Sequence, residues 1–439
     1  MTEYIVISMG LAVGSFVGFF LLILLLLRLN SKKIFGIYPR KGLFYHLKYG
    51  IALVVLKYMR SKLCHRKEEE MASLERPQVM SEHPKSYDVV SFMAANVKGE
   101  KLLVTLERRR RGIIKACLFL WLPDYGRLAF PKMPDMFYFT TNGEEENTEF
   151  KGNGLHIYPK EPMKSWCIKY EGALEQVPEN KLFQVKLDLE FTSTARHFDY
   201  NRDLSSSLIA DATAREAWNE AFYIMCMNVD KILDNRTHYE QVGNLKGDLM
   251  VEERGRTTLN MNCIRDHSFG TDRCLSTINR YVYFSLFLED GTTMVVGNLS
   301  QPSFFLSSLK VGYVCTSQGE YEPITKCNFE LYSYGEKGVP PNHQNFVVHT
   351  AEMKYFVQIK VEDCAIRYIG GNWESKVYNQ FFSCTVNGKQ GHGITEYLYR
   401  HHGGRPEEVC GQDPEWYQRI RKFERTLSKY EDDDEEFFF

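Results

Sequence analysis

The stretch Arg265-Asp266-His267-Ser268-Phe269-Gly270 places a cation, a carboxylate, an imidazole and a hydroxyl at consecutive positions and closes on a glycine. In a regular strand, side chains alternate between the two faces of the sheet. Arg265, His267 and Phe269 would then face one side, and Asp266 and Ser268 the other. Only one of the two candidate acids, Asp266 or His267, can therefore look into a barrel, and the other belongs to structure.

Runs rich in β-branched and aromatic residues surround this stretch and are separated by turn formers. Asp290-Gly291 and Asn387-Gly388 lie between such runs and predict hairpins. We expect strands at residues 101–107, 112–122, 182–191, 281–288, 346–349, 355–361 and 378–386. The pattern predicts a mainly antiparallel β protein, either barrel or sandwich, with one helix at 211–225 that connects two β halves.

An uncharged run at residues 4–27 determines the expected compartment. It is long enough to cross about 30 Å of hydrocarbon as one helix, and too long for a signal peptide. Basic residues follow from Arg28 to Lys67, with no acid before Glu68. The positive-inside bias therefore predicts a single-pass membrane protein whose C-terminal body is cytosolic, with the endoplasmic reticulum or another endomembrane as its location.

Two neighbouring segments predict contact with lipid or with a second helix. Gly10, Gly14 and Gly18 recur every fourth residue, so they line one helix face through which a homodimer can form, although glycine is also simply common in membrane helices. Residues 42–63 mix apolar and basic side chains, which favours a helix lying in the membrane interface over a tightly packed helical hairpin. Residues 65–86 are charged and predict a linker.

Charge and cysteine content exclude several classes of function. The net charge of the 439 residues is −2, so nucleic acid is not an expected partner. Eleven cysteines are scattered without a CxxC pair, and in the cytosol we expect free thiols. His392, His401 and His402 have no metal-ligand spacing with them, so neither a metal nor another cofactor is expected. Arg108 to Arg111 are read as a solvated loop rather than a phosphate or lipid-headgroup site.

Three further stretches carry a family resemblance together with the first. They are Trp166-Cys167-Ile168-Lys169-Tyr170-Glu171-Gly172, Gly243-Asn244-Leu245-Lys246-Gly247 and Gly391-His392-Gly393-Ile394-Thr395-Glu396-Tyr397. The chain resembles an AttH-like family related to carotenoid 1,2-hydratase and, more distantly, to tocopherol cyclase. It also resembles the N-terminal region of invertebrate phosphoenolpyruvate synthase-like proteins. The resemblance covers residues 86–405 and implies two lipocalin-like β-barrel halves.

Two departures limit what the resemblance implies. The family usually continues its histidine motif with an Arg-Asp-Trp run, whereas this chain has Asp272-Arg273-Cys274. Nothing in the chain resembles the nucleotide-binding or phosphohistidine domains of phosphoenolpyruvate synthase, so a phosphotransferase is not expected.

The resemblance also implies a reaction type. Hydration or cyclisation of an isoprenoid begins with protonation of a carbon–carbon double bond, which requires an acid held protonated in an apolar cavity. Asp266 or His267 can be that acid. The reading that we favour over catalysis is a structural polar cluster, with Glu396 as the partner of Arg265 or His267, and a ligand-binding cluster comes second. The members of this cluster are Arg265, Ser268, Asp272, Arg273, His392 and Glu396.

These inferences combine into one expected organisation. A membrane anchor (1–33) precedes a basic juxtamembrane helix and linker (34–86), two barrel halves (87–230 and 231–410), and a short helix with an acidic, Phe-ended tail (411–439). The favoured function is binding of a hydrophobic small molecule, a lipid or an isoprenoid, at a membrane surface. The alternatives are a hydratase or cyclase type of enzyme and a non-catalytic membrane interaction module.

Overall fold

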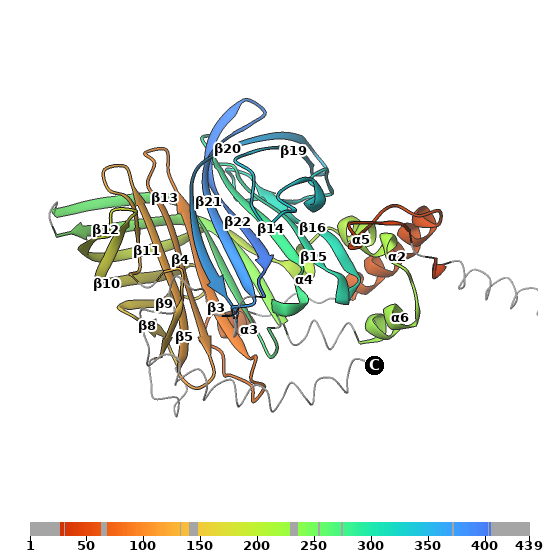
Figure 1. Cartoon of the computed structure of the whole chain (residues 1–439), viewed down its shortest axis with the longest axis horizontal. Helices are drawn as coiled ribbons and strands as arrows, with labels where there is room; N and C mark the ends of the chain where they lie inside the picture. Colours follow the sequence, from red (N-terminus) through yellow and green to blue (C-terminus); the bar gives the residue numbers. More distant parts are fainter. Residues whose placement is uncertain are drawn as a thin grey trace, which may run out of the picture.

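The computed structural model describes residues 27–29, 31–62, 68–131, 133–139, 148–228, 236–252, 255–273, 275–370, 373–402 and 404. The expected membrane-spanning run up to residue 26, with Gly10, Gly14 and Gly18, lies outside the described residues, as does the C-terminal segment 411–439. Within the described ranges, no helix is both long and apolar enough to cross a membrane. The fold is mainly β, as the sequence predicts, and contains two large sheets (Figure 1).

The first sheet has eleven strands and closes on itself. Its order is β11-β12-β13-β3-β4-β5-β6-β10-β9-β8, β7 pairs with β5, and β10 also pairs with β11. The strands are β3 (Tyr87–Ala95), β4 (Lys101–Arg109), β5 (Ile113–Leu122), β6 (Gly126–Ala129), β7 (Phe137–Phe139), β8 (Phe150–Gly152), β9 (Leu155–Glu161), β10 (Ser165–Val177), β11 (Lys181–Asp199), β12 (Arg236–Val251) and β13 (Gly255–Gly270). Side chains fill the barrel, among them Phe92, Trp166 and Phe191.

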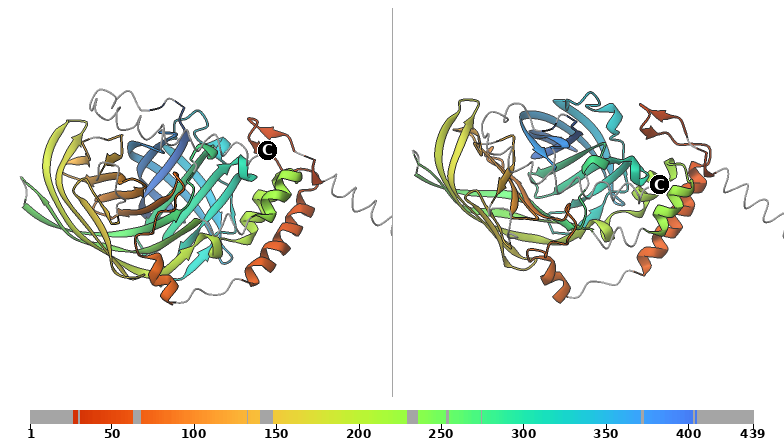
Figure 2. Two further views of the ribbon diagram at one scale, coloured as in Figure 1. Left: turned by 90° about the horizontal axis from the view of Figure 1, so that it is seen from below. Right: turned by 60° about the horizontal axis from the view of Figure 1, so that its bottom comes forward.

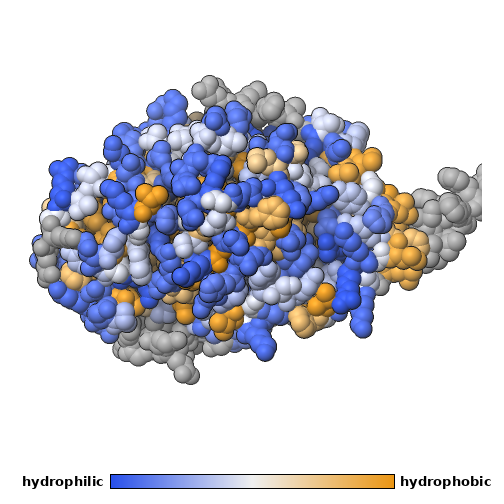
Figure 3. Space-filling model, turned by 90° about the horizontal axis from the view of Figure 1, so that it is seen from above, coloured by the Kyte–Doolittle hydropathy of each residue, from blue (hydrophilic) through white to orange (hydrophobic). Residues whose placement is uncertain are grey.

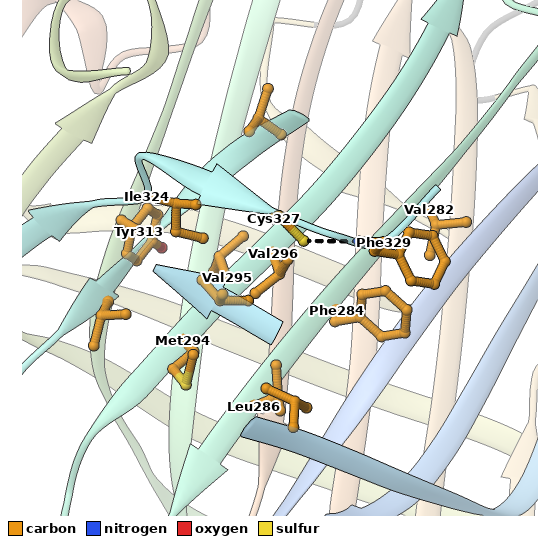
Figure 4. Close-up of a cluster of buried hydrophobic side chains, with 14 of the residues drawn as sticks. Val282, Phe284, Leu286, Met294, Val295, Val296, Tyr313, Ile324, Cys327 and Phe329 are labelled. Atoms are coloured by element: carbon orange, nitrogen blue, oxygen red, sulfur yellow. Dashed lines mark hydrogen bonds between the residues drawn. The ribbon is translucent and has the colours of Figure 1, made fainter. Parts of the chain in front are cut away.

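The second sheet has nine strands in the order β17-β16-β15-β14-β22-β21-β20-β19-β18. They are β14 (Arg280–Leu288), β15 (Thr293–Gln301), β16 (Leu306–Cys315), β17 (Tyr321–Pro323), β18 (Lys326–Cys327), β19 (His343–His349), β20 (Lys354–Ile369), β21 (Ser375–Val386) and β22 (Lys389–Arg400). Alternate residues of β14, namely Val282, Phe284 and Leu286, pack into its core (Figure 4). Asn387 and Gly388 both have positive φ in the β21–β22 turn, as the Asn-Gly pair predicts.

The two sheets are joined by a third apolar layer and by ion pairs. Leu103 and Phe119 of the first sheet pack with Phe381 and Ile394 of the second. Lys101 Nζ lies 2.5 Å from Glu362 Oε2, and Arg127 Nη1 lies 2.8 Å from Asp363 Oδ2. The outer face of the barrel strands β3 to β6 is therefore covered by the second sheet.

Helices α2 (Tyr45–Ser61), α5 (Ser206–Arg215) and α6 (Glu220–Met227) lie together at one end of the molecule, whereas α3 (Glu68–Leu74) and α4 (Tyr200–Asp203) lie nearer its middle (Figure 1). The longest is α2, which packs beside α5, as Figure 2 shows. The remaining elements are short 3₁₀ turns at Leu275–Thr277, Pro302–Phe304 and Leu331–Ser333, and a small hairpin of β1 (Lys33–Ile34) and β2 (Tyr38–Pro39).

The connector between the β halves differs from the expectation. The helix expected at 211–225 is two helices, because the Ser205 and Asn219 side chains each cap a separate helix start. The boundary expected at residue 230 is wrong as a division between sheets. Strands β12 and β13 follow it in sequence but pair with β11 and β3 of the first sheet, so the second sheet begins at β14.

Gly247 shows why the glycine-containing stretches mark the fold. It has φ +154, and a Cβ atom there would lie 2.1 Å from the Asp188 carbonyl oxygen of β11. In β22, a Cβ atom on Gly393 would lie 2.2 Å from the Ser285 carbonyl oxygen. Strands at both places approach too closely for any larger residue.

Gly247→Ala is expected to lower the free energy of unfolding by about 2–4 kcal/mol, because strain at φ adds to overpacking. Denaturant unfolding of the full chain in detergent measures the change. Gly50→Ala is the control, since nothing lies within 4 Å of a Cβ atom in the middle of α2. Equal destabilisation by the two variants would contradict the close approach at Gly247.

Candidate functional site

Strand β13 separates the residues of the first stretch as the alternation predicts. Arg265 and His267 are 0% exposed and point into the filled barrel. Asp266 and Ser268 point away from the barrel and line a cavity between the two sheets. The two candidate acids therefore belong to different environments, and each has its own set of partners.

Arg265 is bound by a carboxylate that the sequence placed in a linker. Its Nη2 lies 2.9 Å from Glu75 Oε1, and the guanidinium lies over the Trp166 ring, 5.0 Å from its centroid. Glu75 is 0% exposed and also accepts hydrogen bonds from Trp166 Nε1 at 2.7 Å and from Tyr239 OH at 2.5 Å. The linker expectation for 65–86 is therefore wrong, because Glu75, directly after α3, is buried among Arg265, Trp166 and Tyr239.

His267 is held by two partners inside the barrel. Its Nε2 lies 2.8 Å from Asp88 Oδ1 and its Nδ1 lies 2.9 Å from Tyr239 OH. Asp88 is in turn bound by Arg108 Nη1 at 2.5 Å. Both ring nitrogens are thus used in a packed interior, which assigns His267 to structure. The solvated loop expected at Arg108 to Arg111 is wrong for Arg108 and Arg109, which are buried on β4 because Asp88 and Glu107 pair with them.

The cavity lies between the outer face of the barrel and the second sheet and has a volume of about 280 Å³. Strands β3, β4, β12 and β13 form one wall, and β14, β15, β20 and β22 form the other. Its apolar lining consists of Val89, Met93, Leu103, Met136, Leu275, Ile278, Val295, Leu299 and Ile369. Charged and other polar side chains line the remainder.

Three titratable side chains converge on this cavity: His238, Glu240 and Asp266. Strand pairing places Glu240 directly opposite Asp266. His238 Nε2 is hydrogen-bonded to Asp266 Oδ2 and lies 3.9 Å from Glu240 Oε1. The side chain of His238 remains 34% exposed and that of Asp266 17%, whereas Glu240 is buried. His238 and Asp266 are thus the members that a ligand can reach.

Tyrosines orient this triad. Tyr200 OH donates to Glu240 Oε1 at 3.0 Å, and Tyr313 OH donates to Glu240 Oε2 at 2.6 Å. The Tyr200 ring also stacks on the His238 imidazole, with centroids 4.4 Å apart. The Glu240 carboxylate and the His238 imidazole are therefore fixed in position before any ligand arrives.

The register of β12 and β13 explains the unusual protonation of the triad. Burial, followed by the charge of Asp266, raises the pKa of Glu240 to about 7, although His238 acts in the opposite direction. Burial opposes a charged imidazole, but the Asp266 carboxylate outweighs it and raises the pKa of His238. Two carboxylates at adjacent positions cannot both ionise easily, so the triad retains protons near neutral pH.

Other charges on the cavity wall are already paired. Glu107 Oε1 lies 2.5 Å from Arg109 Nε and 3.5 Å from Arg273 Nη1. Burial opposes its charge, but Arg109, Lys115 and Arg273 outweigh burial and lower the pKa of Glu107 to about 2. At the cavity's edge, Asp272 Oδ2 lies 3.8 Å from Arg236 Nη2. Arg273 therefore pairs with Glu107, whereas Asp266 pairs with His238.

The sequence led us to expect that Glu396 pairs with Arg265 or His267, and this expectation is wrong. It lines the opposite wall of the cavity, where Arg367 and Tyr281 donate hydrogen bonds to its carboxylate. The barrel wall separates it from Arg265 and His267, which face inward. His392 is not among the cavity-lining residues, and its pKa is lowered by burial.

His238 and Glu240 were missed from sequence, although a signal existed. Arg236, His238 and Glu240 alternate along one strand, which places three titratable side chains on one face. A face of that kind, paired with the outward residue Asp266, indicates a polar site. The imidazole and two carboxylates could also hold a metal ion, since their ligand atoms lie within 4.8 Å of one another. Metal binding would require the present His238–Asp266 hydrogen bond to open.

The raised pKa of Glu240 predicts a pH dependence of stability. Between about pH 4.5 and 7 the unfolded chain releases this proton and the folded chain keeps it, so stability falls as pH rises, by up to about 1.4 kcal/mol per pH unit. The raised pKa of His238 acts in the same direction above its ordinary value. Glu240→Gln should therefore gain stability relative to wild type as pH rises through this window.

Denaturant unfolding of wild type and Glu240→Gln across this range measures the difference. Glu171→Gln is the control, because Glu171 forms an exposed pair with Lys186. If the difference in unfolding free energy between wild type and Glu240→Gln did not change with pH, a buried proton on Glu240 would be ruled out.

Comparisons with known proteins give a family and several similar structures. A family model described as "Family of unknown function (DUF8627)" matches residues 12–399. No curated protein matches. An AttH protein of Nitrosomonas europaea is 11% identical, covering 74% of this chain and 98% of its own, with a TM-score of 0.44.

Two further solved structures are also similar to this chain. Kievitone hydratase of Nectria haematococca is 11% identical, covering 73% of this chain and 90% of its own, with a TM-score of 0.43. CghA with Sch210972 is 8% identical, covering 75% and 96%, with a TM-score of 0.44. An AttH protein is thus among the similar structures, and the phosphoenolpyruvate synthase-like resemblance gains no support from these comparisons.

Proposed function

This chain belongs to the family of unknown function DUF8627, and we propose that it binds a small, largely apolar molecule between its two sheets and transfers a proton to or from it. The observation that carries the proposal is the convergence of His238, Glu240 and Asp266 on a cavity that also has a continuous set of apolar lining residues from both sheets. The reaction class is addition or elimination of water, or a double-bond shift.

The chemistry follows from which groups hold protons. Protonation of a double bond needs an acid that stays protonated at neutral pH near an apolar ligand. The His238–Asp266 pair delivers its proton to one carbon, and buried Glu240 beside it can replace that proton. In a hydration, the hydroxyl of a water molecule adds to the second carbon as water's remaining proton returns to the triad. Elimination of water reverses these steps.

The volume of the cavity limits the ligand. About 280 Å³ is at the lower end of the range for small-molecule sites. It suits a short isoprenoid or a single-ring compound, not a whole carotenoid. The proton donor is His238, paired with Asp266, rather than His267, whose ring nitrogens are used inside the barrel.

We also propose that the protein is anchored in a membrane. We place the run 4–27 across a membrane with the body on its cytosolic side, and the Gly10, Gly14 and Gly18 face as a contact between two copies. A hydrophobic ligand can then enter from the adjacent bilayer. Binding without reaction is the second candidate, favoured by the apolar part of the lining.

Solvent extraction and mass spectrometry of the full chain purified from cells tests ligand binding. Wild type should release a small apolar compound that Ser285→Trp, which fills the cavity, does not. Thr257→Trp is the control, because Thr257 lies exposed on β13 away from the cavity. If Ser285→Trp fails to fold, Val295→Phe tests the same volume. No compound in wild type, or equal amounts in folded cavity variants, would overturn the proposal.

A further inference from the structure

One side of α2 is fixed against the rest of the molecule. Tyr45, Lys48 and Ala52 are its buried residues. Tyr45 OH donates to Asp211 Oδ1 at 2.5 Å, and Lys48 Nζ donates to the Glu216 carbonyl oxygen at 2.7 Å. These contacts with α5 and the residues after it set the rotation of α2 about its axis, so its opposite side has a defined orientation.

That opposite side is apolar and exposed. Leu47, Ile51, Val54, Val55 and Tyr58 follow helical spacing and are between 38% and 69% exposed. Leu43, just before α2, is 89% exposed, and Met227 at the end of α6 is 76% exposed. Hydrophobic side chains gather at this end of the molecule in the space-filling view (Figure 3).

Charge decides which partner this face fits. Residues 31–62 contain no acid, and exposed basic side chains flank the apolar ones: Arg40, Lys41, Lys57 and Lys62. Lys62 Nζ lies over the Tyr58 ring, 4.3 Å from its centroid, and Lys41 lies 4.4 Å from that of Tyr45. An apolar stripe with a mainly basic border matches an anionic lipid surface, where lysines reach the headgroups and apolar side chains enter the acyl boundary.

The chain that precedes α2 supports the same partner. Leu27, the last residue of the uncharged run 4–27, is buried with Ala52, Trp218 and Phe222. Trp218 N donates a hydrogen bond to the Leu27 carbonyl oxygen at 3.1 Å. The uncharged run therefore joins the folded body beside α2, on the same end of the molecule as its exposed face.

We propose that the exposed face of α2, from Leu43 to Tyr58, lies in the interface of a membrane with anionic headgroups. This orients the body so that α2 and α5 lie nearest the bilayer and the β12–β13 hairpin lies farthest from it (Figure 1). The inference is independent of the chemistry in the cavity, since none of the α2 residues lines it.

Quenching by lipids brominated near the headgroup end of their acyl chains tests this position. The full chain is reconstituted in vesicles of phosphatidylcholine and phosphatidylserine. The emission of the native tryptophans, measured on wild type, is subtracted from the emission of each variant. Val54→Trp should lose at least half of its added emission. Met250→Trp is the control, because Met250 is 48% exposed near the β12–β13 turn at the opposite end. It should lose almost none.

Leu47→Trp repeats the test if Val54→Trp does not fold. Phosphatidylcholine alone, or high salt, should weaken the quenching, because the basic border then contributes less. Equal quenching of Val54→Trp and Met250→Trp would overturn the proposal. It would also be overturned by an unquenched Val54→Trp whose emission shifts with protein concentration, since a second copy would then cover the face.

Discussion

Replacing Arg265 by alanine is expected to lower the free energy of unfolding by about 3–5 kcal/mol, because it leaves the Glu75 carboxylate buried without its cation. Both side chains are 0% exposed, so water cannot replace the lost partner. The guanidinium also packs on the Trp166, Phe191 and Tyr239 rings, and those contacts are lost with it. Denaturant unfolding of the full chain in detergent measures the change.

Arg256→Ala is the matched control on the same strand. Arg256 is 68% exposed and pairs with Asp248 at the surface, where an ion pair contributes about 0–1 kcal/mol. Glu75→Gln tests the other half of the buried pair and should also be strongly destabilising. If Arg265→Ala matched Arg256→Ala, the ion pair that holds α3 against the barrel would not contribute to stability.

Asp266→Asn is expected to lower turnover of the extracted ligand by about 10²–10⁴-fold, the usual contribution of a positioned acid or base. The amide keeps the shape of the side chain but removes the charge that raises the pKa of His238. Ligand affinity should change far less than turnover, since the apolar lining remains. Steady-state kinetics and equilibrium binding with the extracted compound separate the two effects.

Asp248→Asn is the control for this substitution, because Asp248 lies outside the cavity and binds Arg256. His238→Gln should cause a loss of similar size, and the double variant should lose little more, since the two residues act as one unit. Full turnover by Asp266→Asn would remove the pair from the mechanism and leave binding without reaction as the function.

The sequence predicts much of this fold because its signals are local. The hairpins at Asp290-Gly291 and Asn387-Gly388 depend on positive φ at Gly291, Asn387 and Gly388, and the strand ranges depend on period-two patterning. The same alternation correctly assigned Arg265 and His267 to one face and Asp266 to the other. Glycine-rich stretches marked the fold because strands cross closely at Gly247 and Gly393.

Long-range pairing explains what the sequence did not predict. Glu75 is charged and follows a helix of seven residues, so its sequence neighbourhood resembles a solvated linker. Arg265 follows Glu75 by 190 positions and lies inside the closed sheet. Only this long-range pairing makes the Glu75 carboxylate a core group. Likewise, the pKa of Glu240 is raised in part because the β12–β13 register places it opposite Asp266, and no local pattern fixes that register.

The division of the chain shows the same limit. Strands β12 and β13 follow the connector helices, which favours assigning them to the second half. Their pairing with β11 and β3 instead closes the first sheet. The outward face of β13 then meets the second sheet, which is why the cavity contains Asp266 rather than Arg265 or His267.

Deuterium incorporation into the co-purified compound tests the central claim most directly, namely that a proton moves in the cavity between the sheets. The compound extracted from wild type is incubated in D₂O with fresh full-length protein and examined by mass spectrometry. Carbon-bound deuterium should appear with wild type and with Asp248→Asn, but not with Asp266→Asn. Absence of deuterium with wild type that retains the bound compound, or equal incorporation by Asp266→Asn, would contradict it.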